Sequence, residues 1–84
     1  MNKANSNIKE LNRNLVLFGK SLREFRKEAG LSQDELSFQS GVDRSYISEI
    51  ENGLKAPSIL TILALTGSLK IKPSDLMDRF ENKS

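Results

Sequence analysis

Apolar residues recur at spacings of three and four along much of this chain, which is the period of helices packed on one side. The first apolar stripe consists of Leu15, Phe18, Leu22, Phe25 and Ala29. It predicts a helix over residues 15–29 that stops at Gly30. No stretch shows the sustained alternation of apolar and polar residues that is typical of a half-buried strand. The pattern therefore predicts an all-α fold.

Capping signals predict where the next two helices begin. Ser32, with Glu35 three residues later, has the spacing of a capping box. Asp43 is a good N-cap for the following helix, and its charge suits the positive end of the helix dipole. We expect that helix to end near Asn52, with Gly53 as its C-cap.

The last third of the chain predicts two more helices. Ser58 is a plausible cap for a fourth helix that ends near residue 66 or 67, and Pro73 suits the first position of a fifth helix that ends near Phe80. The prediction is therefore a compact bundle of five helices over residues 14–80, followed by a C-terminal tail over residues 81–84.

Residues 32–52 have the layout of a DNA-binding helix-turn-helix, because two short helices would meet at a tight turn at Gly41. Glycine suits such a turn because it tolerates a positive φ. The apolar positions that would press the two helices together are Leu36, Val42, Ile47 and Ile50. The other side of the second helix is polar and would enter a major groove, with Arg44, Ser45, Ser48, Glu49 and Asn52.

Composition excludes several other kinds of site. The chain has no cysteine and no histidine, so we expect no disulfide, no metal site, no cofactor and no enzyme activity based on histidine. The N-terminal residues are polar, and no apolar run approaches the ~20 residues that span a bilayer. We therefore expect a cytoplasmic protein that does not contact a membrane.

The net charge of +2 is a weak signal, and it is unevenly placed. Residues 1–13 hold three basic residues and one acidic residue, whereas the remainder holds ten of each. Residues 1–13 show no convincing period, so we expect a flexible arm with at most a frayed turn around residues 8–11. Two interpretations of this arm stay open: a disordered tail, or a basic arm that touches DNA.

The segment FGKSLREFRKEAGLSQDELSFQSGVDRSYISEIENGLKAPSILTILALTGSLKIKPSDLM, residues 18–77, resembles the phage-repressor-like, xenobiotic-response-element helix-turn-helix family. The resemblance rests on Gly-Leu-Ser-Gln at 30–33, Gly-Val at 41–42, Ile-Ser-Glu-Ile-Glu-Asn-Gly at 47–53 and Pro-Ser at 57–58. It implies a lambda-repressor-like fold. Residues 43–48 further resemble the recognition helix of restriction–modification controller proteins. Ser37 departs from the usual Ala, and Phe38 stands at a normally polar outer position, where it either packs on the arm or stays exposed.

The resemblance also implies roles for single residues. Gln33 would reach a phosphate at the start of its helix, and Lys55 lies in a loop that the family uses for backbone contacts. The matching pair of Arg26 and Glu51 forms a partly buried ion pair in such proteins. Tyr46 either binds a phosphate or packs at the rim of the core.

We also expect a role in DNA contact for each polar side chain of the recognition helix. Arg44 suits guanine, whose O6 and N7 it can meet with two hydrogen bonds, and Ser45 is ambiguous between bases and phosphate. Ser48, Glu49 and Asn52 follow on the same side. The alternative for each of these side chains is a solvated polar surface.

The fourth predicted helix has more apolar residues than one core-facing side needs. The surplus residues are Leu60 and Leu63, and Met77 and Phe80 on the fifth predicted helix would extend them into one apolar patch. It indicates a homodimer interface, unless these residues simply close a loose core. The leading hypothesis is thus a sequence-specific transcriptional regulator, either a repressor or an activator, that binds double-stranded DNA at a two-fold symmetric operator as a homodimer without a small-molecule effector. The alternative is a toxin-neutralising or other protein-interaction module on the same fold.

Overall fold

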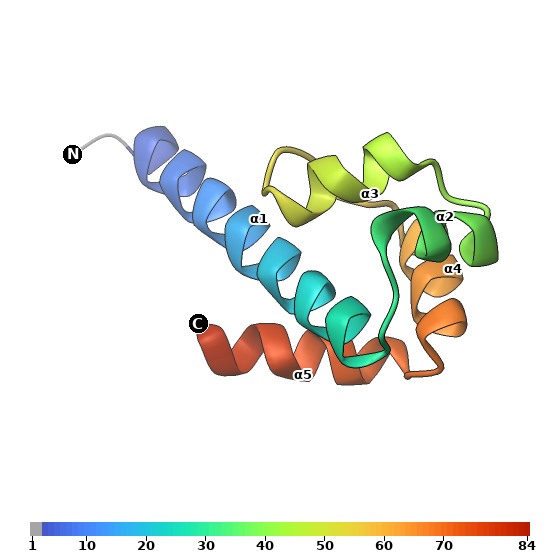
Figure 1. Ribbon diagram of the computed structural model, residues 1–84. Helices are drawn as coiled ribbons and strands as arrows, with labels where there is room; N and C mark the ends of the chain where they lie inside the picture. Colours follow the sequence, from blue (N-terminus) through green and yellow to red (C-terminus); the bar gives the residue numbers. More distant parts are fainter. Residues whose placement is uncertain (1–2) are drawn as a thin grey trace.

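The computed structural model describes residues 3–84, with side chains from residue 7 onward, and this part of the chain contains five α-helices and no strand. The helices are α1 (Lys3–Glu28), α2 (Gln33–Ser40), α3 (Arg44–Glu51), α4 (Ile59–Leu69) and α5 (Pro73–Lys83). Figure 1 shows α5 against the second half of α1, with α2, α3 and α4 grouped on one side of α1. The predicted all-α bundle of five helices is confirmed.

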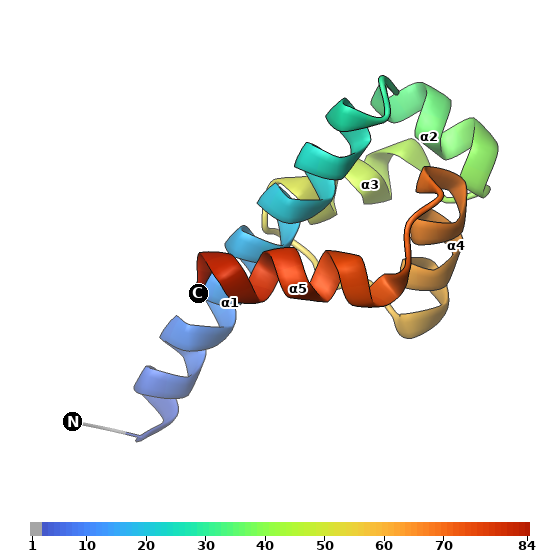
Figure 2. The same cartoon turned by 90° about the horizontal axis from the view of Figure 1, so that it is seen from below.

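The first helix is much longer than its apolar stripe predicts. It begins at Lys3, so residues 3–13 are helical instead of forming a flexible arm, and residues 1–2 lie outside the described part. Ile8 and Leu11 continue the spacing of Leu15 upstream, and no glycine or proline interrupts the helix before Gly19. Figure 2 shows these first turns projecting beyond the other helices, which is why Ile8 and Leu11 stay more than half exposed.

The predicted caps of α2 and α4 are confirmed. The Ser32 Oγ accepts a hydrogen bond from the Glu35 backbone N–H at 3.0 Å, and the Glu35 Oε1 accepts from the Ser32 N–H at 2.9 Å. The hydrogen bond from the Ser32 backbone N–H lowers the pKa of the Glu35 carboxyl, and the Ser32 side chain lowers this pKa further. The Ser58 Oγ likewise accepts from the backbone N–H of Thr61 at 3.1 Å.

The cap of α3 differs from the prediction. Asp43 occupies the N-cap position, but its side chain makes no capping hydrogen bond. It accepts from the Ser45 hydroxyl instead, at 2.8 Å. The helix then ends at Glu51, with Asn52 as C-cap and Gly53 next at a φ of +73°.

The last two helices run further than expected. The fourth continues to Leu69, and its C-cap Lys70 adopts a left-handed conformation with a φ of 58°. The fifth continues to Lys83, so most of the predicted tail is helical. The Lys83 Nζ donates to Glu24 Oε2 of α1 at 2.7 Å, and this long-range contact holds the last turn in place.

All five helices contribute to one core. Its buried members are Leu22, Leu36, Ile47, Ile50, Leu65, Leu69 and Leu76. Val42 packs against this core while half-buried, whereas Ala29 is exposed because α1 has already ended. Within residues 3–84, none of the helices combines the length and apolar content needed to cross a membrane.

Candidate nucleic-acid interface

Two serines fix the turn between α2 and α3. The Ser37 hydroxyl donates to the Val42 carbonyl at 2.6 Å, and the Ser40 Oγ accepts from the Val42 N–H at 3.1 Å. The Ser37 hydroxyl, at a position where the family usually has Ala, thus finds its partner across the turn and not at the carbonyl one turn back in its own helix. Gly41, between Ser40 and Val42, provides the left-handed residue of the turn, with a φ of +75°.

The third helix has one buried side and one polar side. Ile47 and Ile50 are fully buried, and Glu51 joins them on the inner side. The outer side carries the five candidate base-reading residues. Arg44, Ser45 and Asn52 are exposed there, whereas Ser48 and Glu49 are half-buried. The structure therefore presents a polar helix surface that is backed by an apolar core, as insertion into a groove requires.

A buried ion pair ties α1 to the last residue of α3. The Arg26 Nε lies 2.7 Å from Glu51 Oε2, and Arg26 Nη2 lies 2.9 Å from Glu51 Oε1. The Arg26 Nη1 donates to the Leu31 carbonyl at 2.8 Å, so the guanidinium is held by three hydrogen bonds. The hydrogen bonds to Glu51 raise the pKa of Arg26. This is the pair that the resemblance implies, and it fixes the position of α3.

Gln33 joins the same network, a link that sequence reasoning missed. Its Nε2 donates to Glu51 Oε1 at 3.1 Å from the first residue of α2. A carboxamide has two N–H donors, so one is still available for an anion. Nothing in the spacing of residues 33 and 51 signals this contact, because it depends on how the two helices cross.

Backbone contact brings α1 and α3 together at Gly19. A Cβ at this position would lie 2.3 Å from the Ile50 carbonyl oxygen and 2.8 Å from that of Glu51. Gly19 lies in the segment that resembles the family, but its spacing alone does not predict this contact. In the structure its lack of a side chain is what lets α1 cross the end of α3 directly.

We expect Gly19→Ala to destabilise the protein by about 1–3 kcal/mol in urea unfolding, because two backbones must move apart. Gly67→Ala in α4 is the matched control, since a Cβ there meets nothing within 4 Å. That substitution should be neutral or stabilising by about 0.5–1 kcal/mol, the usual gain from replacing a helical glycine. A Gly19→Ala protein as stable as its Gly67→Ala counterpart would contradict the tight crossing.

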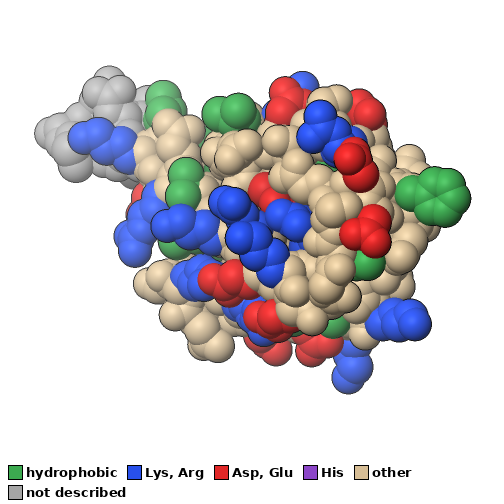
Figure 3. Space-filling view, viewed as in Figure 1, with side chains coloured by type: hydrophobic (Ala, Val, Ile, Leu, Met, Phe, Trp, Pro, Cys, Tyr) green, Lys and Arg blue, Asp and Glu red, His purple; other side chains and the backbone are tan. Residues whose placement is uncertain are grey.

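Two exposed ion pairs partly neutralise the polar surface of α3. The Arg44 Nε lies 3.2 Å from Asp34 Oδ1 of α2, and the Lys55 Nζ lies 3.8 Å from Glu49 Oε1. Exposed pairs of this kind contribute about 0–1 kcal/mol, so an anionic partner can displace the carboxylates. Figure 3 shows acidic and basic side chains intermixed over this part of the molecule. Among the described residues no cluster suited to a metal ion occurs.

Tyr46 acts mainly within the protein. Its side chain packs against the core while half-buried, and its hydroxyl donates to the Ala56 carbonyl at 3.3 Å. The single hydroxyl proton is thereby used, so a phosphate contact would require breaking this bond. This geometry favours rim packing over phosphate binding. Asn52 also has an internal partner, because its Nδ2 donates to the Ser48 Oγ at 3.4 Å.

The apolar patch on α4 and α5 is mostly exposed. Leu60 is 77% exposed and Leu63 is 50% exposed, so neither closes the core. Phe80 differs, because it is half-buried and its ring meets the Phe18 ring edge-on at a centroid distance of 6.4 Å. Met77 lies between these extremes, at 39% exposed.

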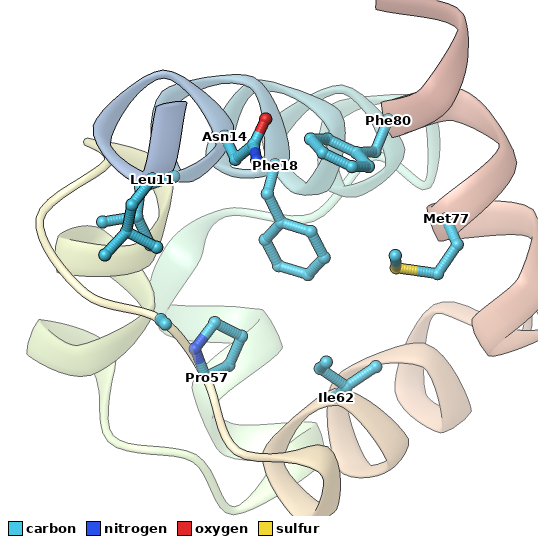
Figure 4. Close-up of a pocket in the computed structure, with 9 residues that line it drawn as sticks. Leu11, Asn14, Phe18, Pro57, Ile62, Met77 and Phe80 are labelled. Carbon is cyan, nitrogen blue, oxygen red and sulfur yellow. The ribbon is translucent and has the colours of Figure 1, made fainter. Parts of the chain in front are cut away.

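A hollow of about 240 Å³ adjoins this patch. Figure 4 shows Phe18, Ile62 and Met77 pointing into it from α1, α4 and α5. Asn14 is the one polar side chain among its lining residues. The patch and the hollow together form a largely apolar surface, which typically marks a contact with another chain.

Comparison with known proteins places this geometry among helix-turn-helix proteins. Residues 22–76 match the helix-turn-helix family HTH_3. The control protein C.BamHI of Bacillus amyloliquefaciens is 36% identical over 64 residues, which cover 75% of this chain and 79% of that protein. The crystal structure of the restriction-modification controller protein C.AhdI of Aeromonas hydrophila has a TM-score of 0.74 and 47% identity, covering 76% of this chain and 97% of that one. SinR, a master regulator of biofilm formation solved in complex with DNA, has a TM-score of 0.70 and 35% identity, covering 73% of this chain and 98% of that one.

Proposed function

The chain belongs to the helix-turn-helix family HTH_3, and we propose from this membership that it is a transcriptional regulator that binds a two-fold symmetric DNA operator as a homodimer. The observation that carries the proposal is the polar outer surface of α3, which is backed by buried Ile47 and Ile50 and anchored through Glu51. The similarity to a DNA-bound regulator supports the choice of duplex DNA as partner. A cytoplasmic location is part of this proposal, because DNA is the partner.

The residues of the interface then divide by role. Arg44 reads a base edge, after release from Asp34, while Ser45, Ser48, Glu49 and Asn52 line the groove around it. Gln33 and Lys55 hold the phosphate backbone on either side of α3. The Arg26–Glu51 pair orients α3, and it also orients Gln33.

The homodimer is proposed to form through the apolar patch of Leu60, Leu63, Met77 and Phe80. These residues lie on α4 and α5, which follow the helix-turn-helix in the chain. A two-fold contact there would pair the patch with its own copy. It would set the two recognition helices about 34 Å apart, the distance between successive major grooves on one side of a duplex.

A narrower role is proposed from the relatives. C.BamHI and C.AhdI are both controller proteins, and C.AhdI is named for restriction–modification. We therefore infer that the genes regulated by this protein include those of a restriction–modification system. Selection of bound duplexes from a random pool would test the operator, and its position beside such genes would test the role.

Arg44→Ala tests the reading of bases. We expect it to weaken binding to the selected operator by about 1–3 kcal/mol and to relax preference at one base position in each half-site. The measurement is a fluorescence-anisotropy titration against the operator and its single-base variants. Lys70→Ala, at the left-handed end of α4, serves as a control that should keep both affinity and preference. If Arg44→Ala retains the full base preference, α3 is not the reading element and the proposal is wrong.

A further inference from the structure

Basic side chains form a continuous stripe along one side of α1. The members of this basic stripe are Lys9, Arg13, Lys20, Arg23 and Lys27. Their spacings of four, seven, three and four residues place them on one side of a helix, with Val16 filling the turn between Arg13 and Lys20. All five are exposed. At a rise of about 1.5 Å per residue, the stripe is roughly 27 Å long.

Two of the three acidic residues of α1, Glu24 and Glu28, are held in ion pairs with α5, whereas Glu10 is exposed. Glu24 and Glu28 both bind Arg79 of α5, and Glu24 also binds Lys83 at 2.7 Å. None of the ion pairs found among the described side chains includes a member of the basic stripe. Figure 3 shows basic side chains gathering where α1 crosses the view. The two paired carboxylates of α1 are therefore turned towards α5, and the basic stripe is available to an external anion.

The stripe is continuous with the proposed DNA interface. A Cβ at Gly53 would lie 2.8 Å from the Val16 Cγ2, so the stripe passes directly beside the loop that follows α3. That loop carries Lys55. Towards the N-terminus the stripe continues onto the turns that project beyond the other helices, where Lys9 and Arg13 lie (Figure 2).

We propose that the basic stripe binds the phosphate backbone of duplex DNA outside the segment that α3 reads, which lengthens the footprint of each protomer. The inference rests on the proposed function and extends it, because Lys9, Arg13 and Lys20 precede the segment that matches the family. A row of positive charges suits a partner with closely repeated negative charge. Duplex DNA carries about one charge per 1.7 Å of its axis, and release of its counterions rewards each cation that approaches.

The experiment compares two duplexes and two double variants. One duplex is limited to the selected operator, and the other extends it by about two helical turns, ~20 base pairs, on each side. The test variant is Lys9→Gln with Arg13→Gln, which keeps good helix formers at exposed positions. The matched control is Lys70→Gln with Lys72→Gln, which removes the same charge at the turn between α4 and α5. Circular dichroism should show equal helical content in all three proteins.

We expect the native protein to show a steeper salt dependence of binding on the extended duplex than on the short one. The test variant should lose about 0.9 of slope in log Kd against log salt for each lost contact, or about 1.8 per protomer, on the extended duplex alone. The control variant should keep the native slope on both duplexes.

Three outcomes would overturn the inference. An unchanged slope in the test variant would show that the stripe does not touch DNA, and an equal loss on both duplexes would place its contacts inside the operator. An equal loss of slope in the control variant would show that the effect comes from the net charge of the protein and not from the position of the stripe. Failure of the selection to yield any bound duplex would instead reject the proposed function. If Arg44→Ala loses operator binding while the test variant keeps the native slope, that function stands and the stripe alone is rejected.

Discussion

Glu51→Ala is expected to lower the free energy of unfolding by about 3–5 kcal/mol, because it leaves a buried guanidinium without its counter-charge. The Arg26 and Glu51 side chains are only 9% and 2% exposed, so water cannot replace the lost partner. For a domain of this size each kcal/mol shifts Tm by roughly 4–8 °C, so the melting temperature should fall by about 12 °C or more. Thermal and urea unfolding followed by circular dichroism would measure both quantities.

Two further variants distinguish the cost of an unpaired buried charge from the cost of removing a glutamate side chain. Glu49→Ala lies on the same helix but removes a carboxylate from an exposed pair with Lys55, so it should change stability by less than about 1 kcal/mol. Replacing both members of the buried pair by methionine should recover part of the loss from Glu51→Ala, because no unpaired charge is then left. If Glu51→Ala has the same melting temperature as the native protein, the ion pair does not hold α3 in place.

Leu63→Glu is expected to convert the proposed dimer to a monomer and to weaken operator binding by roughly 10²–10⁴-fold, because two linked half-site contacts become separate events. Two-fold symmetry would place a new carboxylate on each side of an otherwise apolar contact. Sedimentation equilibrium measures the association, and anisotropy titration measures the binding. Because Leu63 is half exposed, the monomer should keep its helical content.

Phe38→Glu is the matched control for that experiment. Phe38 is 90% exposed on α2, so it tests an exposed apolar residue outside the patch. This variant should stay dimeric. If Leu63→Glu also stays dimeric, the interface lies elsewhere, and if it unfolds, Leu63 belongs to the core.

Local signals in the sequence were enough to predict most element starts. The caps at Ser32 and Ser58 depend on contacts over three residues, and both form as predicted. Helix ends were harder, because tertiary contacts set them. The last turn of α5 is held by a contact between Lys83 and Glu24, which are far apart in the chain. The start of α1 was missed because a polar helix that projects beyond the body has only a weak apolar pattern.

The candidate site was predictable as a set of residues but not as a set of contacts. The polar side of α3 follows from helical spacing alone. The partners of Arg44 and Gln33 do not, because Asp34 and Glu51 meet them only through the crossing of helices. Tyr46 shows the same limit, since its hydroxyl bonds a loop carbonyl ten residues away.

The backbone contact at Gly19 has a consequence for engineering new specificity. Because α1 meets the carbonyl groups of α3 directly, the placement of α3 does not depend on its outward side chains. The inward side chains Ile47 and Ile50 and the anchor Glu51 are distinct from those that face outward. Outward residues can therefore be transplanted from another regulator as a set, while the scaffold keeps its shape and delivers the new surface to the same depth in the groove.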